Sequence, residues 1–212
     1  MPRNREIEIK LPVLDVEKLI ARLRKVGAKR IGRVYEENTL FDTEDRQLGA
    51  RQAILRIRRE ENADSRGKSA EKSRSKGAPI GGLLTYKGLV EGQSGTEEKY
   101  KEREEIEYRI RDARRFARVL KGIGMRQWFR YEKYRAKYRT AYAGLNIDLD
   151  ETPIGTFLEL EGPRRAIDRA ARALGYSGHD YITVSYLELY AAECSRKGVK
   201  VANMVFEKEK KR

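Results

Sequence analysis

Charged and apolar residues alternate along much of this chain. In residues 5–10, R-E-I-E-I-K, Glu6, Glu8 and Lys10 fall on one side of an extended strand, and Ile7 and Ile9 fall on the other. The same two-residue period recurs, and the short connections between most such segments indicate an antiparallel sheet or barrel. The predicted strands cover residues 5–10, 38–43, 53–58, 83–87, 102–110, 131–139, 145–150 and 156–161.

Four other segments space their apolar residues three or four apart, which is typical of amphipathic helices. Asp15 can cap the first of them, and Gly27 ends it. Pro163 suits the first turn of the third, which stops at Gly175. The predicted helices cover residues 16–26, 112–122, 163–174 and 184–195, so the sequence predicts an α+β fold.

Two segments show neither pattern. Residues 61–82 are rich in serine, glycine and charge, and predict a flexible loop between two strands. Residues 196–212 read as a basic C-terminal tail. The rest of the chain, residues 1–195, is interpreted as a single domain, because 212 residues suit one domain with a substantial core.

Composition narrows the possible functions. The chain has 47 basic and 33 acidic residues, and its net charge of +14 predicts affinity for anions such as nucleotides, polyphosphate, nucleic acid or acidic lipid. A single cysteine, Cys194, and a single histidine, His179, disfavour a disulfide, a cysteine zinc site and a Ser-His-Asp triad. No apolar run is long enough to span a bilayer, and the first residues lack a secretory signal, so we expect a cytoplasmic protein with no membrane partner.

The polar face of the predicted strands is nearly all ionisable. An ordinary solvated sheet face would mix in Ser, Thr, Gln and Asn, and paired acids at four places should repel unless cations lie between them. A sheet that closes on itself removes the difficulty, because helices can then cover the apolar residues outside while the charges line a water-filled tunnel. The residues on this face are Glu6, Glu8, Lys10, Arg56, Arg58, Thr85, Lys87, Arg103, Glu105, Glu107, Lys133, Arg135, Asp148, Asp150, Glu159 and Glu161.

Such a tunnel has a definite chemical use. Carboxylates hold Mg²⁺ or Mn²⁺ through hard oxygen ligands, the metals hold phosphate oxygens, and arginine and lysine bind the remaining phosphate oxygens. Phosphoryl transfer needs mainly this positioning and charge neutralisation. Since seven bases and eight acids on these faces nearly cancel, the predicted tunnel needs divalent cations to attract a polyanion.

The motif E-I-E-I-K resembles the ExExK signature of the CYTH superfamily, also called triphosphate tunnel metalloenzymes. Similar motifs follow in the family's order over about residues 5–190: N-T-L-F-D-T, L-R-I-R, L-T-Y-K-G, R-E-E-I-E, K-Y-R-A-K-Y and L-D-E-T-P-I-G-T-F-L-E-L-E-G-P. The closing L-G-Y-S and S-Y-L-E-L are most similar to the class IV adenylyl cyclase (CyaB-type) branch. The ordered set is much more specific than ExExK alone.

The resemblance implies a closed eight-stranded antiparallel β-barrel with helices outside, commonly dimeric, that binds a triphosphate within. It implies a catalytic set of Glu6, Glu8, Lys10, Glu107 and Asp150. The implied ligands of Mg²⁺ or Mn²⁺ are Glu6, Glu8, Glu159 and Glu161. The implied phosphate-binding bases are Lys10, Arg56, Arg58, Lys87, Arg103, Lys133 and Arg135.

Three functions stay open at this point. Members of the superfamily hydrolyse inorganic, thiamine or nucleoside triphosphate, or cyclise ATP to cyclic AMP and pyrophosphate, and one tunnel serves both reactions. The short segment M-P-R-N-R before Glu6 and the insertion at 61–82 depart from established class IV cyclases, which favours a triphosphatase, with the cyclase as the alternative. A non-catalytic polyphosphate- or RNA-binding module is the third hypothesis. It rests on the basic residues outside the tunnel, which predict weak contact with nucleic acid, but the intact carboxylate motifs argue against it.

Overall fold

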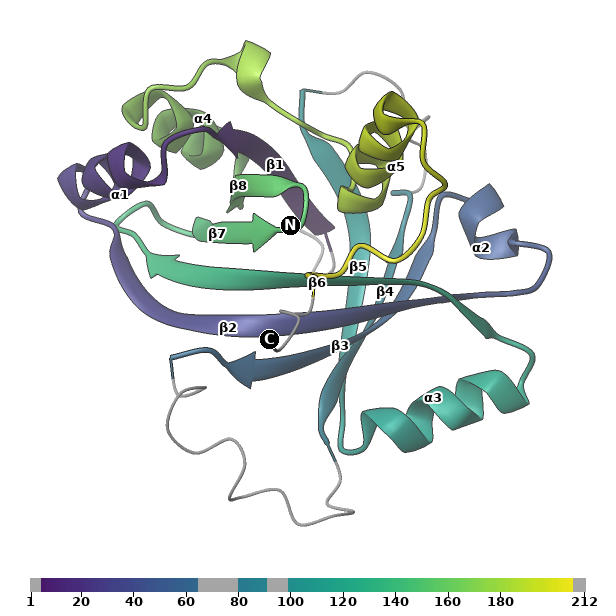
Figure 1. Ribbon diagram of the computed structural model, residues 1–212. Helices are drawn as coiled ribbons and strands as arrows, with labels where there is room; N and C mark the ends of the chain where they lie inside the picture. The colour runs from purple at the N-terminus through teal and green to yellow at the C-terminus, as the bar shows by residue number, and fades with distance from the viewer. Residues whose placement is uncertain (1–4, 65–79, 91–98, 208–212) are drawn as a thin grey trace, which may run out of the picture.

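A computed structural model describes residues 5–64, 80–90 and 99–207, and its centre is a closed barrel of eight strands (Figure 1). Every strand is antiparallel to both neighbours, in the order β1-β5-β4-β3-β2-β6-β7-β8, and β8 pairs with β1 to close the barrel. The predicted closed antiparallel barrel is therefore confirmed. The strands are β1 (Arg5–Val13), β2 (Lys29–Asp42), β3 (Ile54–Asn62), β4 (Gly82–Gly88), β5 (Lys101–Ile110), β6 (Arg126–Arg139), β7 (Asn146–Thr152) and β8 (Gly155–Glu161).

Several strands are longer than the sequence predicted, and β2 and β6 exceed the prediction most. β2 and β6 each have 14 residues and pair along most of their length, whereas the alternation had indicated only residues 38–43 and 131–139. The pairing register shifts between Arg30 and Gly32 and again between Leu40 and Phe41. Such irregularities interrupt the two-residue period locally, whereas residues 32–40 of β2 pair with β6 in one continuous register.

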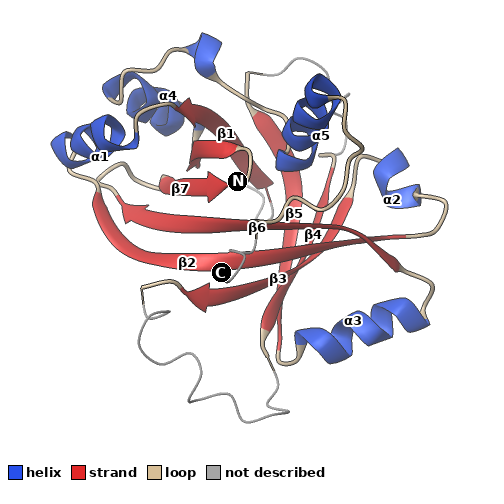
Figure 2. Cartoon of the chain, viewed as in Figure 1, coloured by secondary structure: helices blue, strands red, loops and turns tan. Residues whose placement is uncertain are grey.

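All four predicted helices are present and lie outside the barrel (Figure 2). Asp15, Asp112 and Ser185 cap three of them by accepting hydrogen bonds from backbone N–H groups of the first turn. The short helix α2 and the 3₁₀ turn η1 were not predicted. The helices are α1 (Val16–Lys25), α2 (Gln47–Ala50), α3 (Ala113–Gly122), α4 (Arg164–Ala173) and α5 (Tyr186–Lys197), with η1 at Gly178–Asp180.

The apolar core lies between the barrel wall and the helices, as the inside-out pattern requires. On β1 and β8, Ile9 and Leu160 point outward, have no solvent exposure, and belong to one cluster with Leu23 of α1 and Ile167 of α4. A second cluster joins α3 to the outer face of β3 and β5, with Leu120 among its buried members. Burying these outward side chains is the main driving force for closure, because most of the side chains that face the lumen are charged or polar.

The segment after α5 runs along β6. Met204 forms a parallel bridge with Tyr131, exchanges backbone hydrogen bonds with Arg130 and Glu132, and is almost fully buried. The Phe206 ring lies 5.3 Å from that of Tyr134. Part of the segment predicted as a basic tail at 196–212 is therefore packed on the barrel, whereas residues 208–212 lie outside the described residues.

The loop predicted at 61–82 is shorter at both ends, because β3 continues to Asn62 and β4 begins at Gly82. Its central residues 65–79 lie outside the described residues, so its flexibility stays a prediction. In the described ranges, no helix is both long enough and apolar enough to cross a membrane.

Candidate active site in the barrel lumen

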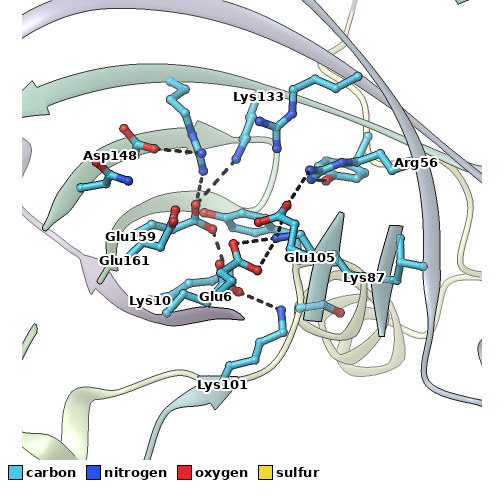
Figure 3. Close-up of a pocket in the computed structure, with 18 of the residues that line it drawn as sticks. Glu6, Lys10, Arg56, Lys87, Lys101, Glu105, Lys133, Asp148, Glu159 and Glu161 are labelled. Atoms are coloured by element: carbon cyan, nitrogen blue, oxygen red, sulfur yellow. Dashed lines mark hydrogen bonds and ion pairs between the residues drawn. The ribbon is translucent and has the colours of Figure 1, made fainter. Parts of the chain in front are cut away.

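The barrel encloses a cavity of about 410 Å³ to which all eight strands contribute side chains (Figure 3). Eight bases and seven acids line it, so the charges nearly balance, as the sequence had indicated. The acids are Glu6, Glu8, Glu105, Glu107, Asp148, Glu159 and Glu161, and the bases are Lys10, Arg56, Arg58, Lys87, Lys101, Lys133, Arg135 and Lys137. The volume is within the usual range for a small-molecule site.

Eleven of the thirteen residues that the resemblance singled out line this cavity. They are Glu6, Glu8, Lys10, Arg56, Arg58, Lys87, Glu107, Lys133, Arg135, Glu159 and Glu161. The two others, Arg103 and Asp150, are not among the lining residues of the described chain. Arg103 lies opposite Glu6 on the neighbouring strand, but it is close enough to Glu188 of α5 to help lower the pKa of that carboxyl.

Asp150 lies behind the cavity wall. It has no solvent exposure, and its two oxygens accept hydrogen bonds from Lys133 (2.8 Å), Arg135 (2.6 and 2.7 Å) and the Tyr186 hydroxyl (2.8 Å). These donors occupy the lone pairs that a metal ion or an attacking water would need. Asp150 therefore holds two cavity bases in place.

One side of the cavity concentrates carboxylates around a few ammonium groups. Lys87 donates to both oxygens of Glu6, at 2.5 and 2.7 Å, and lies 3.1 Å from Glu105. Lys10 and Lys101 donate to Glu8, at 3.0 and 2.8 Å. The ammonium groups separate the carboxylates here, as the paired acids of the sequence required.

Glu161 of β8 lies directly opposite Glu8 on β1, and no ion pair of Glu161 is recorded among the described residues. Burial and the nearby charges of Glu6 and Glu8 raise the pKa of Glu161 to about 7, although Lys87 opposes the change. Burial and Glu8 likewise raise the pKa of Glu6. This side of the lumen therefore carries negative charge that its own lysines do not fully neutralise.

The opposite side is organised around Arg135 and Lys133. Arg135 also contacts Asp148 at 2.9 Å and donates to Glu159. Burial would lower the pKa of Arg135, but the surrounding acids Asp150 and Glu159 raise it well above its usual value. In turn Arg135, Lys133 and Lys10 outweigh burial and hold the pKa of Glu159 well below its usual value. Both groups are therefore fixed as ions in the folded protein.

Glu36 of β2 is a buried acid that the sequence reasoning missed. It has no solvent exposure and accepts no hydrogen bond from the described residues, yet Arg58, Lys133 and Arg135 approach its oxygens to 3.4, 3.5 and 3.7 Å. Burial would raise the pKa of Glu36, but these cations hold it far below its usual value. Glu36 thus supplies a second, hidden counter-charge for the cavity bases.

Glu36 and Lys101 share the same cause of omission. Lys101 lies two residues, one period of the strand, before Arg103, which had been assigned to the inner face. Glu36 lies two residues before Asn38, the first residue of a predicted strand. The predicted strand at 38 began nine residues after the start of β2, and the predicted strand at 102 began one residue after the start of β5. Extending the alternation backward would have found both.

Helix α5 covers one end of the lumen. Ser185, Tyr186 and Leu187 line the cavity there, and the Tyr186 ring centre is 5.2 Å from both the Lys10 and the Lys133 ammonium groups. Two other buried tyrosines belong to the lining. The Tyr131 hydroxyl accepts a hydrogen bond from Arg56 at 3.2 Å, whereas Tyr138 packs in the core cluster. Tyr186 and Tyr131 are therefore held by cavity residues.

The carboxylates of the lumen fit a hard divalent cation. Glu6, Glu8 and Glu161 on the acidic side, and Glu159 across Lys10 from Glu8, offer carboxylate oxygens, the preferred ligands of Mg²⁺ and Mn²⁺. The raised pKa of Glu161 shows that added positive charge would be stabilised at that position. Within the described chain no three acidic, histidine or cysteine side chains form a ready-made metal cluster, so lysine ammonium groups would have to give way to a cation.

Known proteins share this architecture. The profile of the CYTH domain matches residues 4–186. A protein of Methanocaldococcus jannaschii named "Putative adenylate cyclase" is 29% identical over 194 residues, which cover 87% of this chain and 97% of that one.

Solved structures have the same fold. A protein of Pyrococcus horikoshii OT3 matches with a TM-score of 0.68 at 24% identity, covering 89% of this chain and 99% of that one. A Hippeastrum protein, described as a "putative adenylyl cyclase" that reveals a dominant triphosphatase activity, matches with a TM-score of 0.55 at 18% identity, covering 93% and 97% of the two chains. At these identities the structures establish the fold alone. Since the matched profile spans most of the sequence and the barrel is closed, this chain belongs to the CYTH domain family.

Proposed function

We propose that this protein hydrolyses a triphosphate, inorganic or attached to thiamine or a nucleoside, held in the barrel lumen together with Mg²⁺ or Mn²⁺. One observation carries the proposal: fixed cations and partly uncompensated carboxylates face each other across one enclosed cavity. A metal–triphosphate complex has the matching distribution, with phosphate oxygens for the bases and a cation for the acids.

The bases bind and orient the phosphate chain. Asp150 and Glu36 hold Lys133 and Arg135 from behind, so these side chains are in place before substrate arrives. Arg56 is held by Tyr131 and Thr85, each at 3.2 Å. Because the positions are preset, little reorganisation is needed when negative charge spreads over the phosphoryl oxygens during transfer.

The acids Glu6, Glu8, Glu159 and Glu161 are proposed to hold the divalent cation, which when bound supplies charge neutralisation and a more acidic water. Of the two further carboxylates proposed for catalysis, Glu107 lines the cavity and remains a candidate to accept a proton. Asp150 is already saturated by three donors, so we propose a positioning role for it.

The contacts of the tyrosines that line the cavity favour hydrolysis over cyclisation. Cyclisation requires a held nucleoside, and a base is commonly held by stacking on an aromatic ring. Two of the three lining tyrosines are engaged by cavity bases, Tyr186 by Lys10 and Lys133 and Tyr131 through its hydroxyl by Arg56, and the third, Tyr138, packs in the core cluster. The Hippeastrum protein is described as having dominant triphosphatase activity, which supports the same choice.

Adenylate cyclase activity is the second candidate. It is favoured by the name of the Methanocaldococcus jannaschii relative, whose similarity extends over nearly its whole length. The lumen suits either reaction, since the attacking group can be water or a hydroxyl of the substrate itself.

One panel of incubations separates the two. ATP, thiamine triphosphate and inorganic triphosphate would each be supplied with Mg²⁺ or Mn²⁺, and phosphate, pyrophosphate and cyclic AMP would be measured. Orthophosphate release from inorganic triphosphate supports the triphosphatase, whereas cyclic AMP with an equal amount of pyrophosphate supports the cyclase.

Variants test the assigned roles. Glu8→Ala and Glu161→Ala should each abolish turnover, while Arg58→Ala should mainly raise KM. Glu44→Ala is a matched control, because Glu44 is an exposed acid outside the lumen whose partner is the surface residue Arg126. Unchanged rates in both lumen variants would refute the assigned metal ligands.

A further inference from the structure

The outward face of α3 carries basic residues that helix stability does not explain. Arg114, Arg118 and Lys121 are exposed and stand at positions i, i+4 and i+7, so they form one stripe along the helix. Like charges four residues apart repel each other, and the helix contains no acid to separate them. The apolar face of the same helix is already used, because Ala113 and Leu120 are buried against the barrel.

The first turn of α3 also carries basic residues where helix stability favours acids. The N-terminus of a helix carries partial positive charge and favours acids, but α3 has Arg114 and Arg115 there and no acid in its first turn. Of the acids in the described part of the chain, only the cap residue Asp112 is paired with one of them, at 3.4 Å from Arg115. Both arginines therefore oppose the helix dipole.

Helix α4 also has arginines and no acid in its first turn, but Arg164 there pairs with Glu102, and Asp168 lies within the helix. Two other helices show the ordinary arrangement. α1 has Glu17 in its first turn and its basic residues in the last, where the dipole favours them. α5 also ends in bases, and both Arg196 and Lys197 pair with Glu193, at 2.7 and 3.0 Å. Among the described residues no ion pair is recorded for Arg114, Arg118 or Lys121. The charges of α3 are thus available to a partner.

The surroundings of α3 indicate what that partner is. Arg111, exposed just before the cap, extends the stripe, and most of its bases are arginines, whose planar fork matches phosphate oxygens. Tyr108 is 69% exposed and lies on the same outer face of β5 as Ile110, which is buried against α3. An exposed ring beside a row of arginines suits stacking of an unpaired base next to its phosphates.

We propose that α3 and the adjoining part of β5 form a binding surface for single-stranded nucleic acid, made of Tyr108, Arg111, Arg114, Arg115, Arg118 and Lys121. This surface lies outside the lumen, so the inference is independent of the proposed triphosphate chemistry. In Figure 1, α3 and α4 lie far apart on the barrel. Charge-reversal variants of the two helices therefore show whether binding depends on the position of the basic residues or only on the net charge.

The test is fluorescence anisotropy with a labelled 20-nucleotide RNA of mixed sequence, its DNA equivalent and a hairpin duplex, in 50 to 200 mM KCl. Each phosphate neutralised on a single strand contributes a slope of about −0.7 to the logarithm of affinity against the logarithm of salt concentration. About four contacts give a slope near −3, so affinity should fall roughly 50-fold over this range. The single strands should bind more tightly than the duplex.

A triple charge reversal, Arg114→Glu, Arg118→Glu and Lys121→Glu, should remove most of the binding and flatten the salt dependence. The matched control reverses three exposed arginines of α4, Arg165, Arg169 and Arg172, and changes the net charge by the same amount. This control should retain binding within a few-fold. Circular dichroism and thermal melting verify that each variant is folded.

Further measurements separate nucleobase stacking from phosphate contacts, and binding at the α3 surface from binding in the lumen. Tyr108→Ala should weaken single-strand binding without changing the salt slope. Inorganic triphosphate at saturating concentration should not displace the RNA. Equal losses in the α3 and α4 variants, displacement by triphosphate, no binding at 50 mM KCl, or α3-dependent binding to anionic vesicles in place of RNA would each overturn the proposal.

Discussion

Replacing Glu161 by glutamine should stabilise the metal-free protein at pH 8, although the change removes a proposed metal ligand. Burial and the charges of Glu6 and Glu8 raise the pKa of Glu161 from 4.5 to about 7 in the folded lumen. The unfolded chain keeps the ordinary pKa. Above pH 7 the folded protein therefore carries a carboxylate that is better solvated in the unfolded state, and this favours unfolding.

The size and sign of the effect follow from the two pKa values. At about 1.36 kcal/mol per pKa unit, a change from 4.5 to about 7 corresponds to about 3 kcal/mol. Partial solvation of the side chain reduces this, so we expect about 1–3 kcal/mol. Between pH 4.5 and 7 the folded state retains a proton that the unfolded state has lost, so the stability of the wild type falls relative to the variant as pH rises.

Urea unfolding in the presence of a chelator, at intervals from pH 5 to pH 8.5, measures this difference. The excess stability of Glu161→Gln over the wild type should be smallest near pH 5 and should grow to the predicted amount at pH 8. Added Mn²⁺ should stabilise the wild type more than the variant. Glu44→Gln, at an exposed pair, should show no pH-dependent difference. A variant that is less stable at pH 8, or a difference independent of pH, would refute the charge arrangement deduced for the acidic side.

Three further changes test the support of the site. Glu36→Gln should destabilise the protein at pH 7 by about 3–5 kcal/mol in urea unfolding, since it removes a counter-charge of the buried cations Arg58 and Lys133. The stabilisation by Glu36 should vanish when acidification protonates its carboxylate. A loss of less than about 1 kcal/mol would contradict this role of Glu36. Tyr186→Phe removes the hydrogen bond to Asp150 and should cost about 1 kcal/mol, and an unchanged midpoint would mean that this bond contributes nothing. Gly162→Ala should lower the melting temperature by an amount equivalent to about 1–3 kcal/mol. The φ of Gly162 is +149°, and an added Cβ would lie 2.3 Å from the Gly144 carbonyl oxygen. A variant as stable as the wild type would contradict that geometry.

Most of the architecture could be predicted from local periodicity. The alternation at Glu6, Ile7, Glu8 and Ile9 fixes which side chains share a face, and the nearly pure charge of one face indicates that it cannot simply be solvent-exposed. In the structure Ile9 is fully buried outside and Glu8 is buried inside. Both sides of the wall are thus occupied as the pattern required.

Periodicity cannot predict whether an inward-facing side chain reaches the cavity or is covered by its neighbours. Asp148 and Asp150 share a face of β7, yet Asp148 reaches the cavity whereas Asp150 is covered by Lys133, Arg135 and Tyr186. The difference depends on which side chains meet from β6 and α5, far along the chain. A two-residue period assigns a side of the wall, but only the packing of distant elements decides which acid faces the ligand.

The strand ends set a second limit. Glu36 was missed because the predicted strand began at residue 38, nine residues after the start of β2, and Lys101 because β5 begins one residue sooner than predicted. Arg103 shows the converse, since it has the right parity but lies close to Glu188 of α5 and does not line the cavity. Small errors at strand ends therefore change the membership of the site more than they change the fold.

The most direct test of the charged lumen as a metal–triphosphate site is a crystal structure with Mn²⁺ and inorganic triphosphate, with anomalous scattering to locate the metal. The account predicts Mn²⁺ among the carboxylates of Glu6, Glu8, Glu159 and Glu161. The phosphate chain should extend from it toward the bases of the opposite wall. Manganese and triphosphate bound only at the outer surface, with the Lys87–Glu6 ion pair intact and the lumen filled by water, would contradict it.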